Sequence, residues 1–275
     1  AVGQPMYVFY GYRTDGIVQS LAEGLSAGLS GDDAQPGEFK YVDIYDGDGL
    51  ETVDENDMCI IGDPNPDWMA SLGIDVSWRR FDFSIFFNGV FGNDVLNTKR
   101  FDQPSNMPMR CTTDNPTNSY PRLNANRQTK LSDWWVEDGS FVRIQTMTLG
   151  YSIPFSKKDA ARKIRLYVSA DNLYTFTGFE GYDPEVGMTG IYSGGYPRLR
   201  KWTFGADFTF NYQVLPSLAI GGGYSYTDAK AQYTEDQNDP NYMKYLPINA
   251  TSYHNANWKI AWTHKDIGVS LFGRY

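Results

Sequence analysis

The sequence predicts an all-β fold in which antiparallel strands form part of a transmembrane β-barrel. Three observations support this expectation. Apolar and polar residues alternate over runs of roughly 9–12 residues, the length that crosses a bilayer when a strand is tilted. The connections between these runs are alternately short and long, and large aromatic residues stand near the ends of the apolar faces.

The segment Lys201–Phe210, KWTFGADFTF, shows the alternation most clearly. Successive side chains of a strand point to opposite faces of its sheet. One face of this strand carries Trp202, Phe204, Ala206, Phe208 and Phe210, and the other carries Thr203, Gly205, Asp207 and Thr209. An apolar face toward lipid and a polar face toward a water-filled lumen require this division.

The same alternation predicts about nine strands in the chain. We expect them at Met6–Tyr12, Trp68–Trp78, Phe81–Gly89, Phe141–Ile153, Ile164–Asn172, Lys201–Tyr212, Leu218–Tyr226, Trp258–Trp262 and Ile267–Leu271. Backbone groups inside lipid must all be hydrogen-bonded, so such strands need a closed barrel. This number of strands is odd and too small for a wide pore, which indicates a piece of a larger barrel.

The connections are of two kinds. Short turns are expected at 79–80, 154–163, 213–216 and 264–265, and long loops at 13–67, 92–140, 173–200 and 229–254. Outer-membrane barrels have short periplasmic turns and long extracellular loops. We therefore expect the long loops to be extracellular and Phe210 to lie at the periplasmic end of its strand.

Composition narrows the class of protein further. The mean hydropathy is −0.47, and no apolar run approaches the roughly 20 residues of a spanning helix, so a helical membrane protein is excluded. The formal net charge of −9 makes a nucleic acid an unexpected partner. Two alternatives to a piece of a large barrel stay open: a small outer-membrane barrel with a structural or assembly role, and a secreted β-protein that binds glycans.

Catalytic residues are not expected, so we predict that the protein is not an enzyme. Neither of the two histidines, His254 and His264, lies in a serine or cysteine context that suggests a catalytic nucleophile. The two cysteines, Cys59 and Cys111, are too few for a disulfide framework. Either one disulfide joins them in an oxidising compartment, or both are free thiols.

An acidic segment is the candidate metal site. Ca²⁺ prefers six to eight hard oxygen ligands from a flexible loop that contains glycine. The segment supplies carboxylates at Asp43, Asp46, Asp48, Asp54 and Asp57. Counted from Asp46, the fifth position is Leu50, which has no side-chain oxygen, and the twelfth is Asp57, where a glutamate is usual. The more common interpretation of such a segment is a solvated acidic loop, and the alternative is that these five aspartates bind Ca²⁺ as a cofactor.

Several stretches of the chain resemble a known family. They are GQPMYVFYGYRTDGIVQS at Gly3–Ser20, IIGDPNPDW at Ile60–Trp68, FDFSIFFNGVFGNDVLN at Phe81–Asn97, the segment Tyr120–Pro154, the segment Ile164–Gly187, and FGADFTF at Phe204–Phe210. In this order they resemble the SusC-like TonB-dependent transporters of the Bacteroidetes outer membrane. Within that family they are similar to the last few strands of a 22-stranded barrel.

The resemblance implies a function in nutrient import across the bacterial outer membrane. The implied substrate is an oligosaccharide or a peptide, and a SusD-like surface lipoprotein is the implied lid over the extracellular mouth. The TonB system would supply energy through a plug domain, which we expect to lie outside this chain. The expected partners are therefore the SusD-like lipoprotein, TonB, outer-membrane lipid and the substrate.

Residues 211–275 resemble that family less closely. The stretches GGGYSYTDAKAQYTEDQ and WKIAWTHKDIGVSLFGRY are similar to late barrel strands of a general TonB-dependent receptor. A SusC-like chain is expected to stop at Phe210. We therefore divide the chain into residues 1–210, the C-terminal part of a SusC-like barrel, and residues 211–275, additional barrel strands. These strands come from a second homologous region or a composite chain, and the alternative is a family member with a C-terminal extension.

Overall fold

The computed structural model describes residues 3–45, 53–101, 108–123, 130–156, 159–195, 198–232, 244–247, 253–264 and 267–275. The chain divides into two compact units. The sheet unit comprises residues 70–89, 142–176 and 198–275, and the loop unit comprises residues 1–69, 90–141 and 177–197. Each unit thus draws on three separate stretches of the chain.

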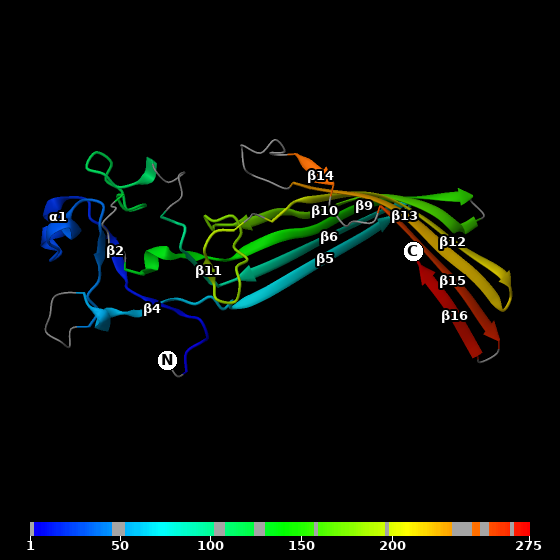
Figure 1. Ribbon diagram of the computed structural model, residues 1–275, viewed down its shortest axis with the longest axis horizontal. Helices are drawn as coiled ribbons and strands as arrows, with labels where there is room; N and C mark the ends of the chain where they lie inside the picture. Colours follow the sequence, from blue (N-terminus) through cyan, green and yellow to red (C-terminus); the bar gives the residue numbers. More distant parts are fainter. Residues whose placement is uncertain are drawn as a thin grey trace. The chain divides into compact units, whose positions relative to one another are not determined.

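The sheet unit is built on one large antiparallel sheet (Figure 1). Its long strands in the described residues are β5 (Trp68–Trp78), β6 (Phe81–Phe91), β9 (Phe141–Ser156), β10 (Asp159–Thr177), β12 (Lys201–Leu215), β13 (Leu218–Gln232), β15 (His254–His264) and β16 (Ile267–Arg274). The strand order is β16-β15-β13-β12-β10-β9-β6-β5, and the short strand β14 (Tyr245–Pro247) pairs with β13. Neighbours in the chain are therefore neighbours in the sheet, as in the wall of a β-barrel.

The long strands form four hairpins that close at the same end of the sheet. The arrowheads of β5, β9, β12 and β15 all point toward the right in Figure 1. In each hairpin the following strand returns, so short connections join the strands at this end and longer stretches of chain leave the other end. The predicted all-β, antiparallel architecture and its alternation of short and long connections are confirmed.

Residues of the same kind stand opposite each other across the strand pairs. The apolar pairs include Phe208 with Tyr224, Tyr212 with Ile220, Leu218 with Trp262, and Ile260 with Leu271. The polar pairs include Arg165 with Asp207, Asp207 with Ser225, and Ser225 with Asn255. Side chains directly opposite one another share a face of the sheet. From β10 to β16, the alternation of each strand is therefore in register with its neighbours, and this part of the sheet has one apolar and one polar face.

Large side chains of the apolar face are exposed in the sheet unit. They include Leu72, Val76, Trp78, Phe81, Phe204, Tyr212, Trp258, Trp262, Val269 and Leu271. A contiguous apolar surface of this kind marks contact with lipid or with another protein. The division has exceptions, because Phe86 and Phe272 are exposed and belong by alternation to the polar face.

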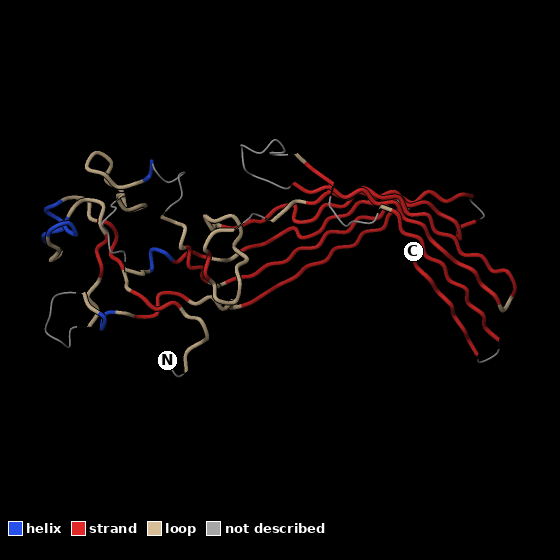
Figure 2. The backbone as a smooth tube through the Cα atoms, viewed as in Figure 1, coloured by secondary structure: helices blue, strands red, loops and turns tan. Residues whose placement is uncertain are grey.

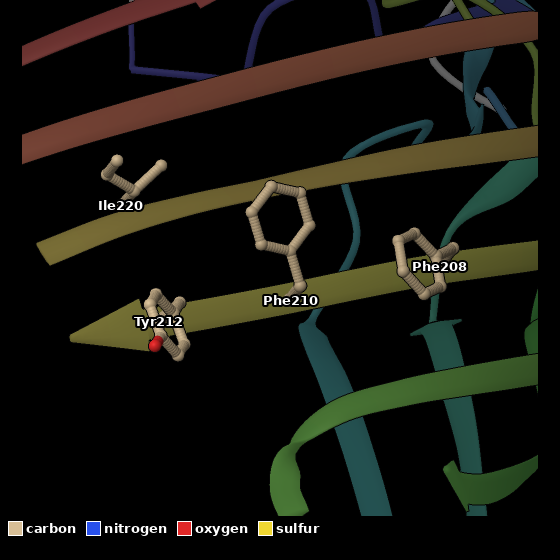
Figure 3. A pocket seen from close by; sticks show the side chains of 4 residues that line it. All are labelled: Phe208, Phe210, Tyr212 and Ile220. Carbon is tan, nitrogen blue, oxygen red and sulfur yellow. The ribbon is translucent and has the colours of Figure 1, made fainter. Parts of the chain in front are cut away.

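A shallow hollow on the apolar face lies over β12 and β13, lined by Phe208, Phe210, Tyr212 and Ile220 (Figure 3). Gly222 of β13 is the direct partner of Phe210 in the register. A Cβ atom at Gly222 would stand 2.9 Å from the Phe210 ring. The glycine therefore gives the ring room to lie close to the neighbouring strand.

The loop unit consists of short elements joined by long irregular segments (Figure 2). Its strands pair as β1 (Phe9–Gly11) with β4 (Cys59–Gly62), β2 (Thr14–Ile17) with β3 (Phe39–Tyr41), and β7 (Asp94–Asn97) with both β8 (Val136–Asp138) and β11 (Ile191–Tyr192). It also contains the helix α1 (Leu21–Ser26) and 3-10 turns at Gly31–Ala34, Glu55–Asp57 and Asp133–Trp135. In the described ranges, no helix is both long and apolar enough to cross a membrane.

The prediction that Met6–Tyr12 forms a strand of the large sheet is wrong. Only Phe9–Gly11 is extended there, and it pairs with β4 inside the loop unit. The reason is local: Tyr7 has a φ of 67°, which a strand cannot accommodate. The large sheet therefore begins with β5, and eight of the nine predicted strands contribute to it.

Two apolar clusters hold the loop unit together. One contains Ile17, Phe39 and Cys111, with Tyr41 and Trp134 packed against it, and the other contains Val95, Phe179 and Tyr192, with Val186. Each cluster joins residues from two of the connections predicted as long loops. These connections are therefore folded against one another and have a core of their own.

Candidate functional site on the polar face of the sheet

An ion-pair network of three residues crosses the polar face. Nε of Arg165 in β10 lies 3.1 and 3.2 Å from the two carboxylate oxygens of Asp82 in β6, and its Nη2 donates to Oδ2 of Asp82 at 2.5 Å. Nη1 of Arg165 lies 3.7 Å from Oδ2 of Asp207 in β12. The planar guanidinium suits this two-pronged contact with a carboxylate, and the network ties three strands together.

Gly150 of β9 makes the Asp82–Arg165 contact possible. Strand β9 lies between β6 and β10, so the two side chains must meet above it. A Cβ atom at Gly150 would stand 2.5 Å from Oδ1 of Asp82 and 2.7 Å from Nε of Arg165. Any side chain at this position would therefore displace one partner of the ion pair.

Further hydrogen bonds extend this polar surface. They join Thr148 to Ser169 at 2.9 Å, Thr146 to Asp171 at 3.2 Å, and the hydroxyls of Tyr167 and Thr227 at 3.4 Å. Lys201 forms an ion pair with Asp171 at 2.5 Å. The face thus presents hydroxyl, carboxylate and cationic groups that are already paired. Such a face can border water without an unpaired charge, and polar solutes can exchange hydrogen bonds with it.

The acidic segment lies in the loop unit, and the structure describes part of it. The carboxylate of Asp57 accepts hydrogen bonds from the backbone N–H groups of Ile44 at 2.7 Å, Tyr45 at 2.9 Å and Asp54 at 2.7 Å. These donors, with the hydrogen bond from the Asp54 N–H as the largest cause, lower the pKa of Asp57 to about 2. Asp57 is therefore a buried anion that fixes the backbone.

Asp54 has a related structural role. Its carboxylate accepts from the N–H of Asn56 at 2.7 Å, and it forms a reciprocal capping box with Asp57 at the start of the Glu55–Asp57 turn. Sequence reasoning missed this role, although an acidic residue followed three positions later by another is a signal for it.

The predicted Ca²⁺ site is not assembled by the described residues alone. Asp43 lies beside Asp57, to which its side chain is hydrogen-bonded. Asp46 and Asp48 lie outside the described residues. Among the residues that the structure describes, no group of three or more histidine, cysteine, aspartate or glutamate side chains could hold a metal ion. Ca²⁺ binding by the five aspartates stays a prediction.

Arg100 is the centre of a polar cluster in the loop unit that the sequence did not reveal. Its guanidinium lies 4.7 Å from the ring of Trp134, and its Nε lies 3.6 Å from carboxylate oxygens of Glu137 and Glu180. The hydroxyl of Tyr120 donates to Glu180. Burial and this carboxylate raise the pKa of Tyr120 to about 12. These residues are far apart in the sequence, so no sequence motif predicts that they form a cluster.

Both cysteines are free thiols, which decides between the two alternatives left open. Cys111 is buried in the first apolar cluster, where its Sγ lies 3.8 Å from the carbonyl oxygen of Val18.

His254, at the start of β15, has its Nδ1 2.5 Å from the hydroxyl of Tyr224.

Comparison with known proteins gives a consistent set of relatives, although no protein-family model matches the chain. It is similar to the TonB-dependent receptor P3 of Formosa agariphila, at 34% identity over 231 residues, which covers 76% of this chain and 22% of the relative. The TonB-dependent receptor P26 of the same organism is 32% identical over 232 residues, covering 76% of this chain and 23% of the relative.

A third relative has a more specific name. The TonB-dependent receptor SusC of Bacteroides thetaiotaomicron is 28% identical over 175 residues, which covers 61% of this chain and 17% of that protein. The chain thus spans about a fifth of the length of these curated relatives. The matches agree with the large antiparallel sheet and its opposed apolar and polar faces. Together they identify the chain as a SusC-like segment related to the TonB-dependent receptors.

Proposed function

We propose that this chain is part of the barrel wall of an outer-membrane, TonB-dependent transporter. The observation that carries the proposal is the two-faced sheet. Its apolar face exposes tryptophan, phenylalanine and leucine side chains, as a lipid contact would require. Its polar face carries the Asp82–Arg165–Asp207 network and the hydroxyl pairs, which suit the lining of a water-filled lumen.

The substrate and partners are part of the same proposal. An oligosaccharide or a peptide is the proposed substrate, because either is rich in groups that exchange hydrogen bonds with a wall of hydroxyl and carboxylate side chains. A SusD-like surface lipoprotein is the proposed partner at the mouth, and TonB the proposed energy source. The names of the relatives support TonB dependence, and the relation to SusC supports the lipoprotein partner.

An uptake experiment on the intact receptor tests the proposal. Cells that carry the receptor and cells from which it is deleted would be given fluorescent oligosaccharides and fluorescent peptides of similar size. We expect the receptor to account for uptake of one class, and we expect a protonophore to abolish that uptake because TonB-driven transport needs the proton gradient. Affinity purification of the tagged receptor should recover a surface lipoprotein.

Two results would contradict the proposal. Equal uptake of every probe with and without the receptor would refute the transport function. Release of the protein from cells without detergent would refute the membrane barrel itself and favour the secreted β-protein.

A further inference from the structure

We infer that the β5–β6 turn binds the head group of an anionic phospholipid through Arg79. The inference rests on the proposed function, because it needs the apolar face to contact lipid. It goes beyond that function by assigning a chemical preference to one point on the lipid-facing rim.

Arg79 is held beside the apolar face by the backbone. Its φ is 57°, in the left-handed region that few residues other than glycine, asparagine and aspartate adopt. In this conformation the guanidinium carbon lies 4.9 Å from the centre of the Trp78 ring. Trp78 is 60% exposed, so the cation rests on an aromatic surface that is open to the surroundings.

The aromatic surface continues along the rim of the sheet. The rings of Trp78 and Phe81 are stacked with centroids 6.4 Å apart, and the Phe81 ring lies 4.7 Å from that of Tyr151 on β9. Aromatic side chains with an apolar body concentrate at the boundary between acyl chains and head groups. The row therefore places Arg79 at the depth where lipid phosphates lie.

The charge of Arg79 has no counter-ion within the described residues. Arg79 and Arg80 are adjacent and both exposed, and neither forms an ion pair with a carboxylate in the part of the chain that the structure describes. A guanidinium offers five N–H donors in a fixed fork that matches a phosphate group. A ligand with an anionic head and an apolar tail would satisfy both the cation and the aromatic row. A soluble anion would satisfy only the first.

Binding of labelled lipids to the intact, detergent-solubilised receptor tests the inference. The probes would be fluorescent phosphatidylglycerol and a phosphatidylcholine with the same acyl chains. We expect the wild-type receptor to bind phosphatidylglycerol more tightly. A basic residue near an anionic surface contributes about 1 kcal/mol, so Arg79→Asn should weaken phosphatidylglycerol binding about fivefold and leave phosphatidylcholine binding unchanged.

The variants are chosen to preserve the fold and isolate the position. Asparagine adopts the left-handed backbone readily, so Arg79→Asn should leave the turn intact. Arg79→Lys keeps the charge and should retain most of the preference. Lys259→Gln removes one exposed positive charge from the polar face, where Lys259 pairs with Gly221 in register, and should have no effect.

Several outcomes would overturn the inference. These are equal binding of the two lipids by the wild type, no loss in Arg79→Asn, and an equal loss in Lys259→Gln. Displacement of the lipid by inorganic phosphate more than by chloride at the same ionic strength would indicate a site for free phosphate instead. A receptor that needs no detergent to stay in solution would refute the proposed membrane function, which is a separate failure.

Discussion

Replacing Gly150 by alanine should break the Asp82–Arg165 ion pair without removing either partner. The added Cβ atom would stand 2.5 Å from Oδ1 of Asp82 and 2.7 Å from Nε of Arg165. Real Cβ atoms do not approach other atoms so closely, so one of the two charged side chains must move away. The change therefore tests whether the pair spans β9 as described.

The expected magnitude follows from the geometry. A hydrogen bond to a charged group contributes about 1.5–3 kcal/mol. The side chains of Arg165 and Asp82 are 27% and 36% exposed, so solvent screening favours the lower end, about 1.5 kcal/mol. Alanine in a strand gains about 0.5 kcal/mol over glycine. The net expectation for Gly150→Ala is a loss of about 1 kcal/mol in the free energy of unfolding.

Gly73→Ala is the matched control. Gly73 also lies in a strand of the sheet unit, and a Cβ there would meet only Phe86, at an ordinary 3.6 Å. This control should be neutral or slightly stabilising, because only the glycine term applies. Urea unfolding of the intact receptor folded in phospholipid vesicles, followed by tryptophan fluorescence, measures both changes.

A double-mutant cycle sharpens the test. In an Asp82→Asn background the ion pair is already weakened, so Gly150→Ala should cost much less than in the wild type. Equal effects of Gly150→Ala and Gly73→Ala in the wild-type background would show that the ion pair does not depend on the glycine, and the reasoning would fail.

Three further predictions concern the loop unit. The pKa of Asp57 falls from 3.8 to about 2 on folding, so its stabilising effect should be complete above pH 3.8 and be lost as the pH falls toward 2. Limited proteolysis of the wild type should therefore become faster over this pH range. The Asp57→Asn variant should lack this pH dependence and be cut faster than the wild type at neutral pH. Tyr120→Phe removes the hydroxyl that donates to Glu180 and should lower the stability of the intact receptor by about 1 kcal/mol in urea unfolding; no change would mean that the hydroxyl bonds water equally well. Ca²⁺ titration by calorimetry should give heat that vanishes when Asp46 and Asp48 are both replaced by asparagine, and the absence of heat in the wild type would refute the Ca²⁺ site.

Much of the sheet could be predicted because its signal is local. Each long strand reads as a period-two pattern, and the strands Trp68–Trp78 and Phe81–Phe91 begin at the predicted residues. The ends of β10 were harder to predict. That strand runs over Asp159–Thr177, longer at both ends than the predicted Ile164–Asn172. Pairing with neighbouring strands keeps the backbone extended through the polar residues at its ends.

The loop unit could not be predicted for the opposite reason. Its clusters join residues such as Phe39 with Cys111, and Val95 with Tyr192, which lie far apart in the chain. No periodicity links them, so the connections looked irregular. The same distinction applies to the candidate site. The polar face could be predicted from the alternation of residues along each strand. The contact of Asp82 with Arg165 above Gly150 could not, because it depends on strand order and register.

The interlocking of the loop unit has a consequence for its dynamics. The N–H of Tyr12 bonds to the carbonyl of Leu131, that of Ile17 to the side chain of Asn118, and that of Leu96 to the carbonyl of Gly190. Three surface connections that could have fluctuated separately are thereby joined into one cooperative unit of local unfolding. Amide protons in all three should then exchange with solvent at similar rates, so the loop unit should open as a whole.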